Sequence, residues 1–246
     1  MAAAMQLATG PPPALESALA REVTRAKEAD PHTPVAVLIG GTLLRPYLER
    51  RLASLLGGIV NVHFLTPAEL ALALGERSLT AAGRRPLPPL ADRVLLRQIA
   101  ATHEGYFEPV RETAGIADAL FHLFGELRGA GYDGETFRHA VGDACETPEK
   151  ADALATLFDD WLSRRSGFYG AADALLSTAA PESPPWTSLT VHGLWEASPA
   201  LRACLARLAE RIPVTLLLPE TGTDADEATA DLRAWALATG AAEQTG

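Results

Sequence analysis

The stretch Pro34-Val35-Ala36-Val37-Leu38-Ile39-Gly40-Gly41 decides the fold class. Its central residues are all apolar, and a proline and a pair of glycines bound them. A short, continuous apolar run of this kind is typical of a strand that is buried on both faces of a parallel sheet. Further runs of the same character span residues 59–65, 189–194 and 214–218, and a weaker one spans residues 5–9.

Amphipathic helical patterns separate these strands. The spacing of apolar residues predicts helices at 14–29, 43–56 and 225–238. Thr66-Pro67-Ala68-Glu69 forms a capping box with proline at the first helical position, so a helix follows the strand at 59–65 directly. Ser198-Pro199 marks a helix start after the strand at 189–194 in the same way. Right-handed crossovers turn this alternation into a parallel sheet with helices on both faces.

The strand pattern is interrupted between residues 88 and 165. Helical stripes replace it at 90–101, 116–127, 136–141 and 151–162. We therefore expect three parts: a sheet domain that begins in residues 1–84, a helical subdomain inserted at 85–165, and the rest of the sheet domain at 166–246. The last residues, 241–246, carry no terminal motif, and we expect a fragment or a truncated product.

The composition favours a folded protein without a membrane span. Apolar residues make up 48% and charged residues 21% of the chain, which is enough to bury a core. The apolar runs are much shorter than the roughly 20 residues that cross a bilayer. The N-terminus lacks the pattern of a secretory signal, so we expect a cytoplasmic protein. Cys145 and Cys204 have no metal-ligand spacing, so no metal site is expected.

The formal net charge of -10 opposes nucleic-acid binding over the whole surface, because Lys and Arg drive phosphate binding. Basic residues nevertheless cluster locally, and such clusters are either solvated helix faces or local phosphate contacts. The clusters are Arg45, Arg50 and Arg51; Arg84 and Arg85; and Arg164 and Arg165.

The first strand-to-helix turn is a candidate site, because parallel sheets bind ligands at the carboxyl ends of their strands. It reads Gly10-Pro11-Pro12-Pro13-Ala14-Leu15-Glu16-Ser17. Against the P-loop pattern GxxxxGK[ST], Gly10 and Ser17 match, whereas Leu15 replaces the second Gly and Glu16 replaces the Lys. The prolines remove N–H donors, and Glu16 places a negative charge where phosphate would bind. We therefore expect neither tight ATP binding nor hydrolysis.

A second segment, Val191-His192-Gly193-Leu194-Trp195-Glu196-Ala197-Ser198-Pro199, follows a late strand and opens a helix. It is similar, position for position, to the motif VDEFQDTSP of UvrD-like superfamily 1 helicases. In that family the Asp-Glu pair holds magnesium and activates water. His192 and Gly193 occupy the places of this pair, and together with Glu196 they complete a degenerate nucleotide site.

Other segments resemble the same family in the same order. Residues 33–52, with Arg45, Arg50 and Arg51, resemble the segment that meets single-stranded DNA. Residues 60–72, with Thr66 at the turn, resemble the TFHSLA element, and residues 167–176 resemble the DFxDLL approach to the second nucleotide motif. Within the family, the pattern is most similar to the AddB type, the B subunit of bacterial ATP-dependent helicase/nucleases.

The resemblance implies a P-loop NTPase-like (RecA-like) α/β fold in which helicase domain 1A is interrupted by a helical subdomain 1B. It places the second helicase domain and the PD-(D/E)XK nuclease outside this chain. It implies a non-catalytic scaffold, without a cofactor, in double-strand break repair and recombination. The implied partners are an AddA/UvrD-like helicase subunit and single-stranded or end-processed DNA, which Arg45, Arg50, Arg51 and Thr66 would bind.

Two other readings remain open. A protein-interaction domain without a DNA role fits the acidic charge. A doubly wound small-molecule enzyme needs a Gly-rich turn after a strand, and Gly40-Gly41 is the candidate for it.

Overall fold

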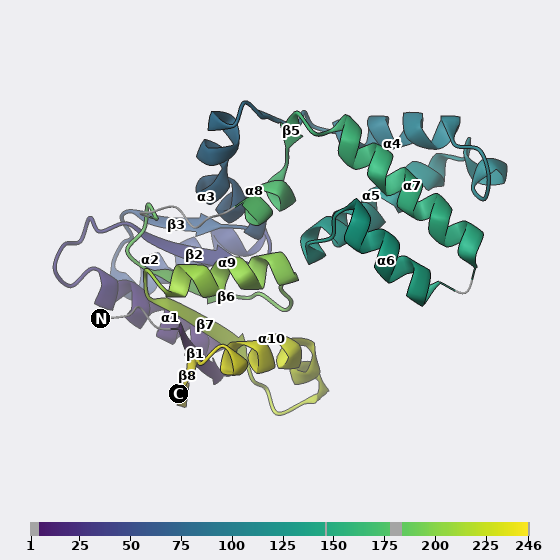
Figure 1. Cartoon of the computed structure of the whole chain (residues 1–246). Helices are drawn as coiled ribbons and strands as arrows, with labels where there is room; N and C mark the ends of the chain where they lie inside the picture. The colour runs from purple at the N-terminus through teal and green to yellow at the C-terminus, as the bar shows by residue number, and fades with distance from the viewer. Residues whose placement is uncertain (1–4, 146, 178–183, 246) are drawn as a thin grey trace. The chain divides into compact units, whose positions relative to one another are not determined.

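The computed structural model describes residues 5–145, 147–177 and 184–245 (Figure 1). The chain forms two compact units. The sheet unit is made of residues 1–74, 178–197 and 201–246, and the helical unit of residues 75–177 and 198–200. The residues expected to form the helical subdomain, 85–165, fall within the helical unit.

The secondary structure alternates in the sheet unit and is mainly helical in between. The strands are β1 (Met5–Gly10), β2 (Val35–Ile39), β3 (Val62–Leu65), β4 (Arg85–Pro86), β5 (Phe168–Tyr169), β6 (Leu189–His192), β7 (Val214–Pro219) and β8 (Ala242–Thr245). The α-helices are α1 (Pro12–Ala26), α2 (Leu44–Leu56), α3 (Pro67–Ala81), α4 (Ala91–Thr102), α5 (Ala114–Ala130), α6 (Gly134–Ala144), α7 (Pro148–Arg164), α8 (Ala171–Ser177), α9 (Pro199–Ala209) and α10 (Glu227–Ala238). Two 3₁₀ turns are η1 (Glu108–Val110) and η2 (Asp224–Asp226).

Six parallel strands form the main sheet, in the order β3-β2-β6-β7-β1-β8. The early strand β2 pairs directly with the late strand β6, with Ala36 opposite Leu189 and Ile39 opposite His192. The prediction of one parallel sheet that joins both ends of the chain is therefore confirmed. All residues of β2 and β6 are buried, including the polar Thr190 and His192 of β6.

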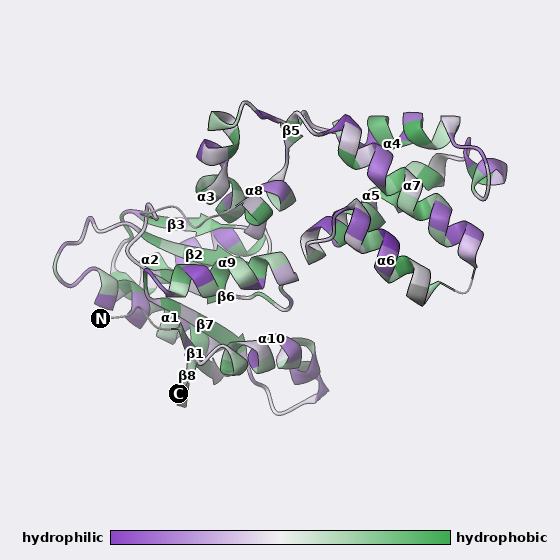
Figure 2. Ribbon diagram, viewed as in Figure 1, coloured by the Kyte–Doolittle hydropathy of each residue, from purple (hydrophilic) through white to green (hydrophobic). Residues whose placement is uncertain are grey.

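Helices cover both faces of this sheet. In Figure 1, α1 and α2 lie behind the strands, and α9 and α10 lie in front of them. The strands are predominantly hydrophobic, whereas the helices mix hydrophobic and hydrophilic residues (Figure 2). The core behind the sheet packs Leu19 of α1 and Leu48 of α2 against Val37 of β2, and all three side chains are fully buried.

Several boundaries differ from the expectation. β3 begins at Val62 rather than at residue 59, because Asn61 has a φ of 54°, which a strand does not adopt. β6 ends at His192 because the next residue, Gly193, has a φ of 68°. β8 was not predicted at all. Among the described strands it lies at the edge of the sheet and pairs with β1, and its sequence lacks a continuous apolar run.

The helical unit has its own core. It lies between α4, α5, α6 and α7, where four aromatic rings pack together. Phe158 is central, with ring centroids 4.9 Å from Phe124, 5.2 Å from Phe137 and 5.8 Å from Trp161. The pair of two-residue strands β4 and β5 forms a separate parallel ribbon.

Two glycines allow the carboxyl ends of β2 and β6 to approach each other. A Cβ atom added at Gly40 would lie 2.1 Å from the backbone oxygen of Gly193. Gly193 itself has positive φ, and a Cβ there would lie 2.5 Å from Leu44 Cδ2. Both positions require glycine, for close approach and for backbone conformation respectively. Gly40 thus allows the carboxyl ends of β2 and β6 to pack closely. It does not form a Gly-rich ligand loop.

We predict that Gly40→Ala lowers the free energy of unfolding of the sheet unit by about 2 kcal/mol, because backbone atoms would have to move. Gly41→Ala is the matched control, since a Cβ there would meet nothing within 4 Å. Urea denaturation followed by circular dichroism measures both. Equal stability of the two variants would contradict the close approach.

Candidate functional site

The first strand-to-helix turn contains no phosphate-binding loop. β1 ends at Gly10 and α1 begins at Pro12, so Pro11 alone connects them. Leu15 and Glu16 lie inside α1, where Leu15 belongs to the buried core. The backbone N–H groups of Ala14 and Leu15 donate to the carbonyl of Pro11, at 2.9 and 3.2 Å. Since the prolines have no N–H, residues 11–15 offer no backbone donor to an anion.

Glu16 is instead the centre of a network between α1 and α2. Its side chain is only 10% exposed. Oε1 accepts a hydrogen bond from Tyr47 Oη (2.5 Å), and Oε2 accepts one from Arg51 Nε (2.6 Å). Burial by itself would raise the pKa of Glu16, but these hydrogen bonds and the charge of Arg51 hold it below its ordinary value. The carboxylate therefore stays ionised and internally neutralised.

His192 lies at the end of β6, a strand that packs against α1, the helix of Glu16. It is 8% exposed, and its Nδ1 has no hydrogen-bond partner among the described residues. Burial lowers the pKa of His192, although the charge of Glu16 opposes this. A neutral, buried imidazole cannot replace a magnesium-binding carboxylate pair on its own. The structure therefore brings together Glu16 and His192, which the sequence placed in one degenerate site.

Ser17 and Glu196, the other polar candidates of that site, do not join this network. Ser17 Oγ donates to the carbonyl of Pro13 in its own helix, at 3.0 Å. Glu196 is exposed on the segment after β6. The surroundings of Glu16 thus contain no second carboxylate from these positions to hold a metal ion.

The candidate DNA-binding residues differ in whether their side chains are already paired within the protein. Arg45 Nη2 forms an ion pair with Glu69 Oε2 (2.5 Å), and the same oxygen accepts from the backbone N–H of Thr66 (2.7 Å). This bond is part of the predicted capping box at the start of α3, which is confirmed. Arg51 is bound to Glu16. Arg50 is exposed and forms no ion pair within the described part of the chain.

The sequence analysis did not identify two features near the carboxyl ends of the strands: the role of Tyr47 and the exposure of two large apolar side chains. Tyr47 lies within the helix expected at 43–56, and its hydroxyl donates a hydrogen bond to Glu16. Leu43 and Trp195 are large apolar side chains that are 91% and 52% exposed. They follow β2 and β6, whose ends are in contact through Gly40 and Gly193. An aromatic residue immediately after a predicted buried strand is the signal that could have indicated Trp195.

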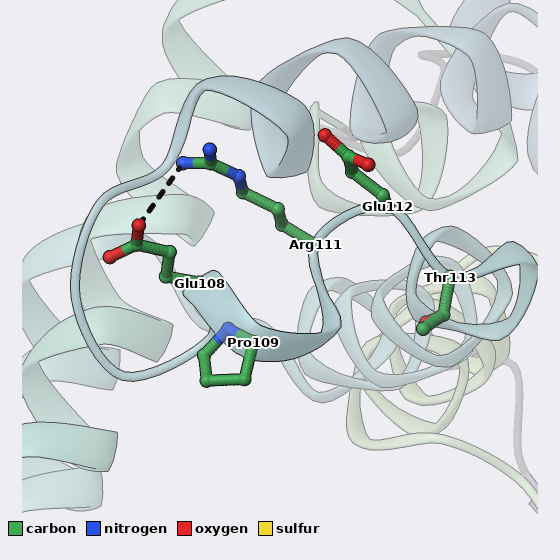
Figure 3. A pocket seen from close by; sticks show the side chains of 5 residues that line it. All are labelled: Glu108, Pro109, Arg111, Glu112 and Thr113. Atoms are coloured by element: carbon green, nitrogen blue, oxygen red, sulfur yellow. Dashed lines mark ion pairs between the residues drawn. The ribbon is translucent and has the colours of Figure 1, made fainter.

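A pocket on the helical unit lies around the 3₁₀ turn η1 (Figure 3). Glu108, Pro109, Arg111, Glu112 and Thr113 line it, and Arg111 Nη1 lies 3.9 Å from Glu108 Oε1. All of these side chains come from one short surface segment. Their charges are solvated and do not converge from several elements, so this pocket is not a catalytic candidate.

A second cavity lies at the carboxyl ends of β1 and β7, beside α10. Its charged lining consists of Glu220, Asp226, Glu227 and Arg233. Arg233 is already paired with Glu220 (3.3 Å) and with Glu243 (2.5 Å). The remaining charge is negative and repels phosphate groups. This cavity therefore does not replace the first turn as a nucleotide site.

The described residues contain no group of three or more His, Cys, Asp or Glu side chains that could hold a metal ion. Burial raises the pKa of Cys204 to about 11, so this thiol stays protonated. No helix within the described ranges is long and apolar enough to cross a membrane. A scan against protein-family models found no match, and a search of curated proteins found none either.

We predict that Arg51→Ala lowers the free energy of unfolding by about 1–3 kcal/mol, because it leaves the buried carboxylate of Glu16 without its ionic partner. Arg50→Ala removes an exposed arginine from the preceding position of the same helix. It should change the free energy of unfolding by less than about 0.5 kcal/mol. Urea denaturation at neutral pH compares the two. Equal losses would show that the Glu16–Arg51 pair contributes nothing specific.

Proposed function

We propose that this chain is the helicase-like scaffold region of an AddB-like helicase/nuclease and is inactive as an ATPase. Its sheet unit would be a RecA-like domain 1A, and its helical unit would be the inserted subdomain 1B. In this role it contacts single-stranded DNA weakly and an AddA/UvrD-like helicase subunit during double-strand break repair and recombination.

One observation carries the proposal. The helicase resemblance assigned Glu16 and His192 to the same nucleotide site, although they are far apart in the sequence. In the structure α1, the helix that carries Glu16, packs against β6, the strand that ends at His192. The strand order also disfavours the reading as a dinucleotide-binding enzyme, because β1 lies between β7 and β8. In the classic dinucleotide-binding order the first strand is next to the second.

The proposal predicts that ATP with magnesium binds with a millimolar or weaker dissociation constant. Phosphate binding needs converging N–H donors and a cation. Here the nearby backbone N–H groups donate to the carbonyl of Pro11, and Arg51 is paired with Glu16. Isothermal titration calorimetry measures this. Glu16→Lys restores the P-loop charge but not the donors, so it should not restore tight binding.

ATP binding by the unaltered chain with a low-micromolar dissociation constant would refute the claim that the first strand-to-helix turn cannot bind phosphate. So would ATP turnover that Ser17→Ala abolishes, because Ser17 Oγ bonds its own helix here. Circular dichroism of Glu16→Lys and Ser17→Ala checks that both variants are folded.

DNA binding in this proposal depends mainly on Arg50. Arg45 and Arg51 are neutralised by Glu69 and Glu16, so they add little net positive charge. Trp195, at the end of β6, offers an exposed ring on which a base can stack. One phosphate contact and one stacking contact fit the expectation of weak binding.

We predict a log-log salt slope of about -0.7 for a labelled single-stranded oligonucleotide, the value for one neutralised phosphate, instead of the -1.4 to -2 that two or three unpaired arginines would give. Arg50→Ala should remove the salt dependence. Arg21→Ala, an exposed arginine further along α1, is the charge-matched control. Fluorescence anisotropy at several salt concentrations measures all three proteins. Identical curves for Arg50→Ala and the unaltered chain would exclude this surface.

A protein-interaction role is the second candidate, and the exposed Leu43 and Trp195 favour it. Exposed Trp side chains are common at the centres of protein interfaces. The net charge of -10 also suits a protein partner better than DNA. Absence of oligonucleotide binding even at low salt would favour this candidate over the first.

A further inference from the structure

One carboxylate in the helical unit forms ion pairs with three arginines. Asp173 of α8 is 5% exposed. Its Oδ2 accepts hydrogen bonds from Arg165 Nη2 (2.7 Å) and from the backbone N–H of Gly170 (2.9 Å). Its Oδ1 accepts one from Arg128 Nη2 (3.1 Å), and Arg84 Nη2 lies 3.7 Å away. The segment after α3, the helix α5, the end of α7 and the turn before α8 therefore meet at one side chain.

This cluster has few acceptors for its donors. The buried Nε atoms of Arg84, Arg128 and Arg165 have no hydrogen-bond partner among the described residues. Asp92 is the second carboxylate of the cluster, and its Oδ1 lies 3.8 Å from Arg165 Nε. Three guanidinium groups thus share two carboxylates, and Asp173 contacts all three.

The two carboxylates differ in character. Burial raises the pKa of Asp92, although the charge of Arg165 and a hydrogen bond from Trp161 oppose it. Burial would also raise the pKa of Asp173, but Arg165, the N–H of Gly170 and Arg128 hold it below its ordinary value. Asp173 is therefore the main counter-charge of the cluster, because it contacts all three arginines, whereas Asp92 lies 3.8 Å from Arg165 Nε.

The ribbon of β4 and β5 is attached to this cluster. Its backbone hydrogen bonds include those from Arg85 N to Gly167 O (3.0 Å) and from Leu87 N to Tyr169 O (2.9 Å). The guanidinium of Arg84 also donates to the carbonyl of Phe168 in β5. A two-stranded ribbon of this length is not stable by itself, so its order must come from packing and from side-chain contacts.

We propose that Asp173 is an electrostatic latch that fastens the β4–β5 ribbon and α8 to the helices α5 and α7. When the ion pairs of this one carboxylate are lost, the ribbon unfolds locally while the aromatic core of α4–α7 stays folded. The latch is a conformational device of the helical unit, and it does not depend on the proposed function.

Asp173→Asn tests the latch, because it keeps the size of the side chain and removes its charge. Hydrogen exchange of the amides of Arg85 and Leu87 should become faster by about 100-fold, as breaking a buried ion pair on one side is strongly destabilising. Exchange in the core segments of α4 and α7 should change less than about threefold. Asp160→Asn is the matched control, since Asp160 pairs with Arg164 on the exposed face of α7 (2.7 Å).

Unchanged exchange at Arg85 and Leu87 would overturn the latch. Equal acceleration throughout α4–α7 would overturn it too, since Asp173 would then support the whole unit rather than the ribbon. If Asp173→Asn does not fold, Arg84→Ala removes the longest of the three arginine contacts together with the hydrogen bond to the carbonyl of Phe168. It must still accelerate exchange of the Leu87 amide relative to Asp160→Asn.

Discussion

A buried carboxylate must be paired and hydrogen-bonded, or it takes up a proton. Glu16 satisfies this requirement with Arg51 and Tyr47, both from the following helix. The contact joins α1 to α2. It explains how a buried glutamate is tolerated in the second turn of α1, and why the guanidinium of Arg51 is already paired there.

The same constraint shapes the proposed DNA contact. Arg51 cannot neutralise Glu16 and a phosphate equally well, and Arg45 is similarly engaged with Glu69. A surface with several arginines in sequence therefore has little net positive charge in three dimensions. The proposed DNA contact would therefore rely on Arg50 and on the exposed Trp195.

Sequence patterns predicted the buried strands and most helices, because continuous apolar runs and capping residues report directly on burial and helix starts. They missed β8, whose order comes from pairing with β1. They could pair the segments of Glu16 and His192 only through a family resemblance. The partners of Glu16, and the three arginines around Asp173, depend on which helices pack together, and no local pattern encodes that. The basic clusters at Arg84 and Arg165 were expected to be solvated helix faces or local phosphate contacts, yet both arginines pair with Asp173.

The pKa of the Glu16 carboxyl group, measured by carbon-detected NMR titration of the unaltered chain, tests the central claim most directly. The closed network predicts a value below the ordinary one of about 4.3 for glutamate. Because the pKa is lowered in the folded state, the network stabilises the protein above the ordinary value, and this contribution is lost as the pH falls through the folded-state pKa. Tyr47→Phe should move the pKa upward. A pKa at or above the ordinary value in the unaltered chain would contradict the account, because Glu16 would then not be held by Arg51 and Tyr47.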